Sequence, residues 1–183
     1  EDGNFFLPEK IKGGTYYFRQ MTEVLDYDYA PDAYFEVDEP YEWTEPLVVE
    51  IPLGASKNNI QVQINDARSG VGLEGVTFDV VADGDTITPD GTVRYHNGDV
   101  VDTIKCDASG YGLSIDLYLG KYELVPRTMP FGYASPELST RLVELERRTA
   151  PGAYAPLKVL DAEKTTVRVT VKDELENSML IPD

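Results

Sequence analysis

The sequence is poor in the residues from which most catalytic and metal sites are built. It has one cysteine and one histidine among 183 residues. One cysteine excludes an internal disulfide, and one of each leaves a zinc site or a cysteine–histidine pair incomplete. Cys106 stands in phase with Ile104 in VVDTIKCDA, which predicts a small core residue rather than a reactive thiol. His96 stands in an HNG turn, outside any serine–histidine–aspartate arrangement, so we expect neither enzymatic activity nor a cofactor.

Basic residues are also scarce. The chain has 16 Lys and Arg residues against 33 Asp and Glu residues, which gives a formal net charge of −17. Nucleic acids and anionic membranes both attract cationic surfaces, so this balance argues against either partner. No apolar run approaches the about 20 residues of a membrane span, and membrane insertion is not expected. A hydrophobic content of 42% is nonetheless sufficient for a packed core.

Short segments with alternating or β-branched residues dominate the chain, and turns rich in Gly, Asn and Asp bound them. Strands of this length and spacing predict an all-β fold of antiparallel sandwiches. The expected strands are IQVQI (60–64), VTFDVV (76–81), TVRYH (92–96), KYELV (121–125) and TVRVTV (166–171). The segment SPELSTRLVELERR (135–148) predicts a short helix near 136–148 with a cap at Ser135 and Glu137, and a strand through 140–146 is the rival.

An internal repeat divides the chain. Residues 1–29 match residues 107–135 at a constant offset. Matched pairs are Gly14 with Gly120, Tyr16 with Tyr122, Thr22 with Thr128 and Tyr27 with Tyr133. We therefore expect the C-terminal part of one β-sandwich at residues 1–54 (the first module), a complete sandwich at residues 55–175 (the second module) and a linker to a following module at residues 176–183.

The join falls at IPLGASKNN (51–59), and so short a link implies limited freedom between the modules. The first module lacks its opening strands, as a fragment of a longer protein would. Those strands lie either upstream or in another chain, because an open strand edge invites pairing.

Three segments of the second module resemble the Cna B-type, or SpaA-like, domains of Gram-positive surface proteins and pilins. IQVQINDARSGVGLEGVTFDVV resembles the opening strand, Asp and Gly turn of that family. DASGYGLSIDLYLGKYELVPRTMPFGY resembles its central Gly-x-Tyr motif, and TTVRVTV resembles its last strand. In the first module, LPEKIKGGTYYFRQ matches the same central motif. The resemblance implies a prealbumin-like β-sandwich.

The resemblance also implies three positions for a spontaneous intramolecular isopeptide bond. A first-strand lysine attacks a last-strand asparagine, assisted by a buried acid on a middle strand. The lysine must be neutral and the acid protonated, so all three must lie in an apolar core. Here the lysine, acid and asparagine positions hold Ile64, Pro126 and Val171, and the acid position of the first module holds Gln20. We therefore expect no such bond in either module.

Asn65 and Lys172 stand one residue away from two of these positions. They alternate to the opposite face of their strands, where an exposed lysine stays protonated and unreactive. Loss of one ammonia in the intact mass would be the sign of a crosslink there.

Two other groups of residues suggest binding sites. Asp83, Asp85 and Asp90 surround glycines in ADGDTITPDG, which suits either a calcium loop or a hairpin turn. The spacing is not that of an EF-hand, so we favour the turn and expect no metal. The stretch 27–43 is rich in aromatic residues, and we take Tyr27, Tyr29, Tyr41 and Trp43 as candidates for stacking on a sugar or a peptide. We favour the other interpretation, in which these rings fill the core and the junction between modules.

The resemblance implies a non-catalytic structural module, a stalk or adhesin repeat of a bacterial cell-surface protein. Such a protein is extracellular, either attached to the cell wall or secreted, and its partners are the neighbouring modules of the same chain. One alternative is a ligand-binding module for a host protein or glycan. Another is an accessory β-sandwich of a secreted carbohydrate-active enzyme.

Overall fold

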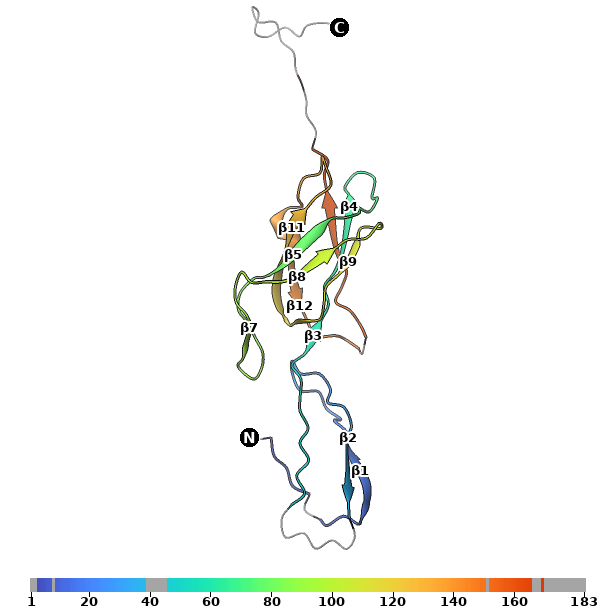
Figure 1. Ribbon diagram of the computed structural model, residues 1–183, viewed down its shortest axis with the longest axis vertical. Coiled ribbons are helices and arrows are strands. Elements are labelled where there is room, and N and C mark those ends of the chain that lie inside the picture. The colour runs from blue at the N-terminus through green and yellow to red at the C-terminus, as the bar shows by residue number, and fades with distance from the viewer. Residues whose placement is uncertain (1–2, 8, 39–45, 151, 166–168, 170–183) are drawn as a thin grey trace, which may run out of the picture.

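The computed structural model describes residues 3–7, 9–38, 46–150, 152–165 and 169. All of its regular structure except one helical turn is β-strand, which confirms the predicted all-β class. Figure 1 shows the strands of the first module and those of the second following one another along the long axis of the molecule. The strands are β1 Gly14–Phe18, β2 Ala33–Val37, β3 Lys57–Asn58, β4 Gln61–Asp66, β5 Thr77–Ala82, β6 Thr86–Ile87, β7 Val93–Tyr95, β8 Val100–Lys105, β9 Tyr111–Leu113, β10 Leu117–Tyr118, β11 Gly120–Thr128, β12 Leu142–Leu145 and β13 Lys158–Ala162, and the helix is α1 Leu138–Arg141.

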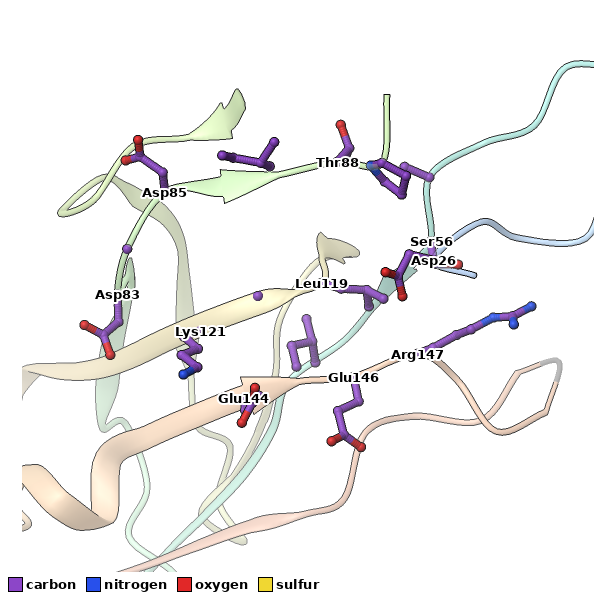
Figure 2. A pocket seen from close by; sticks show the side chains of 16 residues that line it. Asp26, Ser56, Asp83, Asp85, Thr88, Leu119, Lys121, Glu144, Glu146 and Arg147 are labelled. Carbon is purple, nitrogen blue, oxygen red and sulfur yellow. The ribbon is translucent and has the colours of Figure 1, made fainter. Parts of the chain in front are cut away.

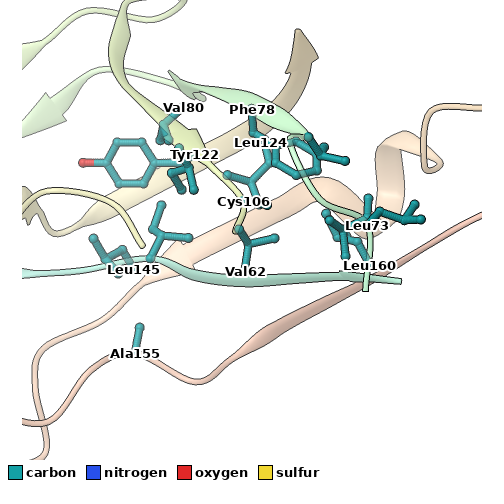
Figure 3. Close-up of a cluster of buried hydrophobic side chains, with 14 of the residues drawn as sticks. Val62, Leu73, Phe78, Val80, Cys106, Tyr122, Leu124, Leu145, Ala155 and Leu160 are labelled. Atoms are coloured by element: carbon teal, nitrogen blue, oxygen red, sulfur yellow. The ribbon is translucent and has the colours of Figure 1, made fainter. Parts of the chain in front are cut away.

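The second module is a sandwich of two sheets. One has the strand order β12-β11-β5-β8 and the other β13-β4-β9. Side chains of β4 and β5 alternate strictly between buried and half-buried, as expected for strands with one face on a core. The two inner faces enclose a cluster of buried apolar side chains (Figure 3), among them Val62, Phe78, Val80, Leu124 and Leu160. Cys106 is 1% exposed within it, so the prediction of a core cysteine is confirmed, and burial raises the pKa of its thiol to about 11.

Four of the five expected strands are present. The fifth, 166–171, lies outside the described residues except for Val169. In the structure β4 lies between β9 and β13, and β13 runs parallel to it and pairs Leu160 with Ile64. Sequence reasoning missed β13, because Lys158 occupies an inward position and the apolar Val159 an outward one.

The segment 135–148 contains both of the elements that its sequence suggested. A single turn, α1, is followed directly by β12, which pairs with β11. The expected cap is wrong, because the N-cap residue is Glu137 and no side chain bonds there. Among the described residues no helix is long and apolar enough to cross a membrane.

Pro126 lies within β11 without costing the sheet a hydrogen bond. Leu124 O accepts a hydrogen bond from Arg141 Nη1 (3.2 Å) on the side toward β12. Pro126, two residues on, directs its backbone nitrogen to the same side. The pairing with β12 ends at Glu123, and the pairing with β5 becomes irregular between Pro126 and Thr128. A proline is tolerated at such a strand edge.

The internal repeat is visible as repeated geometry. β1 pairs with β2 as β11 pairs with β12, so that Gly14 and Gly120 each open the ladder. In both copies the tyrosine two residues later donates from its hydroxyl to the carbonyl four residues before it. Tyr16 Oη lies 2.9 Å from Lys12 O, and Tyr122 Oη lies 2.5 Å from Tyr118 O.

The ends of the two copies also correspond. Tyr27 forms an antiparallel bridge with Ala55, and its repeat partner Tyr133 forms one with Lys164. The residue before each tyrosine has a positive φ, 60° at Asp26 and 84° at Gly132. Two backbone hydrogen bonds accompany each bridge. In the first copy Asp28 N donates to Gly54 O (2.9 Å) and Ser56 N donates to Asp26 O (2.8 Å). In the second copy Ala134 N donates to Glu163 O (2.8 Å) and Thr165 N donates to Gly132 O (2.7 Å).

Candidate functional site

Of the three positions that the family resemblance assigns to the crosslink in the second module, the structure describes Ile64 and Pro126. Ile64 of β4 is fully buried, and the residue beside it on β13, Leu160, is also fully buried. Pro126 is half-buried on β11. Val171 lies outside the described residues. Neither Ile64 nor Leu160 carries an amine, amide or carboxyl group, so this pair adds apolar burial instead of a covalent bond.

The acid position of the first module holds a side chain with a local structural role. Gln20 is half-buried, and its Oε1 accepts a hydrogen bond from Ala30 N (2.9 Å). Its Nε2 donates to Thr22 O (2.8 Å). The amide therefore ties the two ends of the loop that follows β1.

A polar cluster centred on Asp66 lies where β4 ends. The Asp66 side chain is buried, and its Oδ1 accepts hydrogen bonds from the backbone N–H groups of Arg68 (2.9 Å) and Ser69 (2.8 Å). Its Oδ2 accepts one from Tyr133 Oη (2.7 Å) and lies 3.3 Å from Lys164 Nζ. Asp66 thus connects three parts of the second module: the end of β4, Tyr133 at the end of the central motif, and Lys164 in the segment that follows β13.

The Asp66 cluster contains an ion pair between Asp66 and Lys164. The hydrogen bond from Tyr133 and the two backbone donors hold the pKa of Asp66 well below its usual range. Hydrogen bonds to Tyr133 and Asp66 raise the pKa of Lys164. The ion pair and the hydrogen bond from Tyr133 together hold these segments.

The side chain of Asn65, the residue next to the crosslink position on β4, is also held by a hydrogen bond. Its Oδ1 accepts a hydrogen bond from Gln63 Nε2 (2.9 Å) on the same face of the strand. Lys172, its suggested partner, lies outside the described residues.

Two consecutive arginines mark the junction between the modules. Arg147 Nη1 lies 3.1 Å from Glu23 Oε2, and the guanidinium lies 5.7 Å from the ring centroid of Tyr29, so both contacts reach into the first module. Arg148 faces the other way and donates to Lys57 O (3.2 Å). It also donates to Asn59 Oδ1 (2.7 Å) and to Asp116.

A hollow of about 460 Å³ lies beside this junction (Figure 2). Its lining carries five carboxylates and two cations, namely Asp26, Asp83, Asp85, Glu144 and Glu146 with Lys121 and Arg147. Ser56 Oγ is buried in its wall, without a hydrogen-bond partner among the described residues. No group of three or more His, Cys, Asp or Glu side chains in the described part of the chain is placed to hold a metal ion.

Two of the three aspartates suggested as calcium ligands, Asp85 and Asp90, serve separate turn interactions. Asp90 Oδ1 accepts from Thr88 Oγ1 (2.6 Å), and Asp90 Oδ2 accepts from Arg94 Nη2 (3.1 Å) within the β6–β7 hairpin. Asp85 Oδ1 accepts from Asn97 N (2.9 Å). Asp83 N donates to Lys121 O (2.9 Å) on β11, and Asp83 is one of the residues that line the hollow.

The aromatic candidates divide between the junction and the undescribed part of the chain. Tyr27 is half-buried in its bridge with Ala55, and Tyr29 lies under Arg147. Tyr41 and Trp43 lie outside the described residues. The structure brings Tyr27 and Tyr29 together as parts of the joint. Nothing in the sequence distinguishes Arg147, which contacts Tyr29, as a residue of the junction.

No protein-family model and no curated protein matches this sequence. Among solved structures, the Bacillus anthracis TIE protein has a TM-score of 0.51 at 18% identity over 83% of this chain and 25% of that one. The major pilin SpaD of Corynebacterium diphtheriae has a TM-score of 0.46 at 16% identity, over 59% of this chain and 30% of that one. A streptococcal ancillary pilin has a TM-score of 0.41 at 16% identity, over 85% of this chain and 43% of that one.

The chain thus spans a quarter to less than half of the length of these structures. At such identities the likeness shows the fold alone. At that level it confirms the predicted all-β sandwich fold, which this chain shares with the Bacillus anthracis TIE protein.

Proposed function

We propose that this chain is a structural spacer of a bacterial cell-surface protein, in which successive sandwiches hold a distal region away from the wall. Residues 1–54 and 55–175 are the two modules of this spacer. It performs no catalysis, and its setting is extracellular. The family resemblance supports the setting, and the joint between the modules supports the mechanical role.

The observation that carries the proposal is the way the chain leaves the first module. Ser56 N bonds to Asp26 O (2.8 Å) directly before β3 begins at Lys57, so almost no free chain separates the two modules. The Arg147 contacts with Glu23 and Tyr29 add a second attachment beside the first. Two attachments restrain bending where a single flexible link would not.

Spin labels on both modules test this rigidity. Glu36 on β2 and Lys105 on β8 are exposed, and the buried Cys106 does not compete for a thiol-directed label. We expect a single narrow distance distribution between labels at E36C and K105C, which Arg147→Ala broadens. Arg127→Ala is the matched control, because the Arg127–Asp79 pair (3.4 Å) lies within the second module. A distribution that is already broad in the parent protein would refute a stiff spacer.

We further propose that neither module carries the isopeptide bond of the family and that the sandwich resists extension through its strand ladders. The apolar pair Ile64 and Leu160 supports this. The intact mass of the chain should equal the sequence mass. A deficit of one ammonia or one water per molecule would contradict the proposal.

A further inference from the structure

The HNG turn that follows β7 contains a chemically reactive pair of residues. Asn97 is followed by Gly98, and no other asparagine of the chain precedes a glycine. Such a pair can rearrange without an enzyme, because the backbone nitrogen of the glycine can attack the side-chain carbonyl carbon of the asparagine. Glycine favours this attack, since it has no side chain to hinder the approach. Spontaneous deamidation is therefore more favoured here than at any other asparagine of this sequence.

The fold places this pair where the β6–β7 hairpin joins the sandwich. Figure 1 shows the hairpin around β7 projecting from the body of the second module. Asn97 is exposed, so water reaches its side chain. Two backbone hydrogen bonds close the base of the hairpin: Gly98 N donates to Ala82 O (2.9 Å), and Ala82 N donates to Asp99 O (2.9 Å). The nitrogen that would attack is thus already bonded to the end of β5.

Asn97 itself is held by the other end of the hairpin. Its Oδ1 accepts a hydrogen bond from Gly84 N (2.9 Å), and its backbone N donates to Asp85 Oδ1 (2.9 Å). The Gly98 N–H cannot both donate to Ala82 O and be released to attack the Asn97 carbonyl carbon. The closed base of the hairpin therefore blocks the reaction that the sequence favours.

We propose that Asn97 is a protected site of spontaneous deamidation, which reacts only when the base of the β6–β7 hairpin opens. In the open turn Gly98 N loses its proton and bonds to Asn97 Cγ, and the side-chain amide nitrogen leaves as ammonia. Water then hydrolyses the resulting succinimide at either carbonyl, which yields aspartate or isoaspartate at residue 97. Water is the only co-reactant, and no electron transfer occurs. This inference goes beyond the spacer role and does not depend on it.

Deamidation would weaken the contacts that delayed it. Two carboxylates already accept backbone hydrogen bonds in this turn, Asp85 Oδ1 from Asn97 N (2.9 Å) and Asp99 Oδ2 from His96 N (2.7 Å). A carboxylate at residue 97 adds a third negative charge beside them. Isoaspartate also inserts one methylene into the main chain and so displaces the N–H that bonds to β5. The modified hairpin would therefore stay open.

Timed deamidation of the full chain at neutral pH tests the proposal. Trypsin releases the pair in the peptide YHNGDVVDTIK (95–105), whose mass rises by about one dalton when the amide becomes a carboxylate. The same peptide, synthesised and incubated alone, gives the rate without the fold. We expect the full chain to deamidate at least about tenfold more slowly, because only its open fraction reacts. Equal rates would overturn the inference.

The peptide map also keeps this test separate from the test for a crosslink. A succinimide at residue 97 lacks one ammonia, as an isopeptide bond between lysine and asparagine does. The succinimide leaves that deficit within the single peptide 95–105, whereas a crosslink joins two peptides.

Two variants in the loop before β6 identify what keeps the site closed. Asp85→Ala removes the acceptor of Asn97 N. Asp83→Ala is the matched control, because it removes the same charge from a side chain with no hydrogen-bond or ion-pair partner among the described residues. We expect Asp85→Ala to deamidate about tenfold faster than the parent chain and Asp83→Ala to match the parent. Equal rates in the two variants would overturn the inference.

Amide hydrogen exchange at Gly98 provides an independent measure of the opening. Exchange requires release of the same N–H that must leave Ala82 O before the attack. The exchange rate and the deamidation rate should therefore rise together across the parent, Asp83→Ala and Asp85→Ala. Faster deamidation without faster exchange at Gly98 would contradict a site that the hairpin protects.

Discussion

The two modules contain the same central motif in different surroundings. In the second, β11 is covered by β5 on one edge and by the opposite sheet across the core, and Tyr122 is fully buried. In the first, the described residues place β2 alone beside β1, and Tyr16 is half-buried. The local geometry is nevertheless the same, down to the tyrosine hydroxyl bond. The motif therefore determines the hairpin by itself, whereas the core depends on strands from elsewhere in the sequence.

The largest difference between the modules should appear when each motif tyrosine is truncated. Tyr122→Ala opens a cavity in a closed core and leaves Tyr118 O without its donor, so we expect a loss of about 3–5 kcal/mol in the free energy of unfolding. Tyr16→Ala should cost about 1 kcal/mol or less, because its ring is already partly solvated. Urea unfolding followed by far-UV circular dichroism measures the free energy of unfolding of both variants. Equal losses would mean that the first module has a closed core of its own.

The sequence predicted the position of a strand well where one face of that strand is buried. The alternation in 60–64 and 76–81 marks β4 and β5, since each buries every second side chain. The sequence did not predict β13, because the first inward residue of this strand is Lys158, whose amine donates a hydrogen bond to Leu142 O. Alternation reports which face is buried, and it says little about a strand whose first inward residue is charged.

The polar contacts were less predictable than the strands. Asp66 was recognised as part of a motif, but its partner Tyr133 is 67 residues away and Lys164 carries no pattern of its own. Arg147 belongs to a charged run in which nothing distinguishes it from Arg148. Pairings of this kind depend on how loops meet in space, which periodicity does not encode.

A smaller loss is expected in the segment that precedes each motif, which in the second module is strand β9. Gly112 lies in the core of the second module, where an added Cβ would overlap Ile104 Cγ2 and crowd Cys106 Sγ. Gly112→Ala should therefore destabilise by about 1–3 kcal/mol. Its repeat counterpart is Phe6, which is 77% exposed, and Phe6→Ala should change stability by less than about 0.5 kcal/mol. Thermal unfolding of the two variants checks the contrast, and a larger loss at Phe6 would contradict it.

The Asp66 cluster should make the second module sensitive to acid in a defined range. The folded-state pKa of Asp66 is lowered, so its carboxylate contributes stability above the pKa of an unfolded Asp, about 3.9. That contribution is lost as the pH falls from there toward the folded-state value. We expect Asp66→Asn to be less stable than the parent at pH 7 and the gap to narrow below about pH 4.

Urea midpoints at a series of pH values test this. A gap that stays constant with pH would show that the Asp66 charge is not what holds Tyr133 and Lys164. Lys164→Ala is a useful companion, because Ala55 already stands at the matching position of the first module. If the ion pair contributes, this variant should shift the neutral-pH midpoint in the same direction as Asp66→Asn.

The smallest effect should come from exchanging the residues with positive φ that precede the two bridging tyrosines. Asp26 adopts φ 60°, a conformation that Gly132 takes at the same place in the other copy without steric cost. Asp26→Gly should therefore relieve strain and stabilise the first module by about 0.5 kcal/mol, while Gly132→Asp should destabilise the second by about 1 kcal/mol. Because Asp26 O also accepts from Ser56 N at the junction, Asp26→Gly should leave the label distances of the spacer unchanged. A broadened distribution in that variant would show that the aspartate side chain, and not the backbone turn, aligns the two modules.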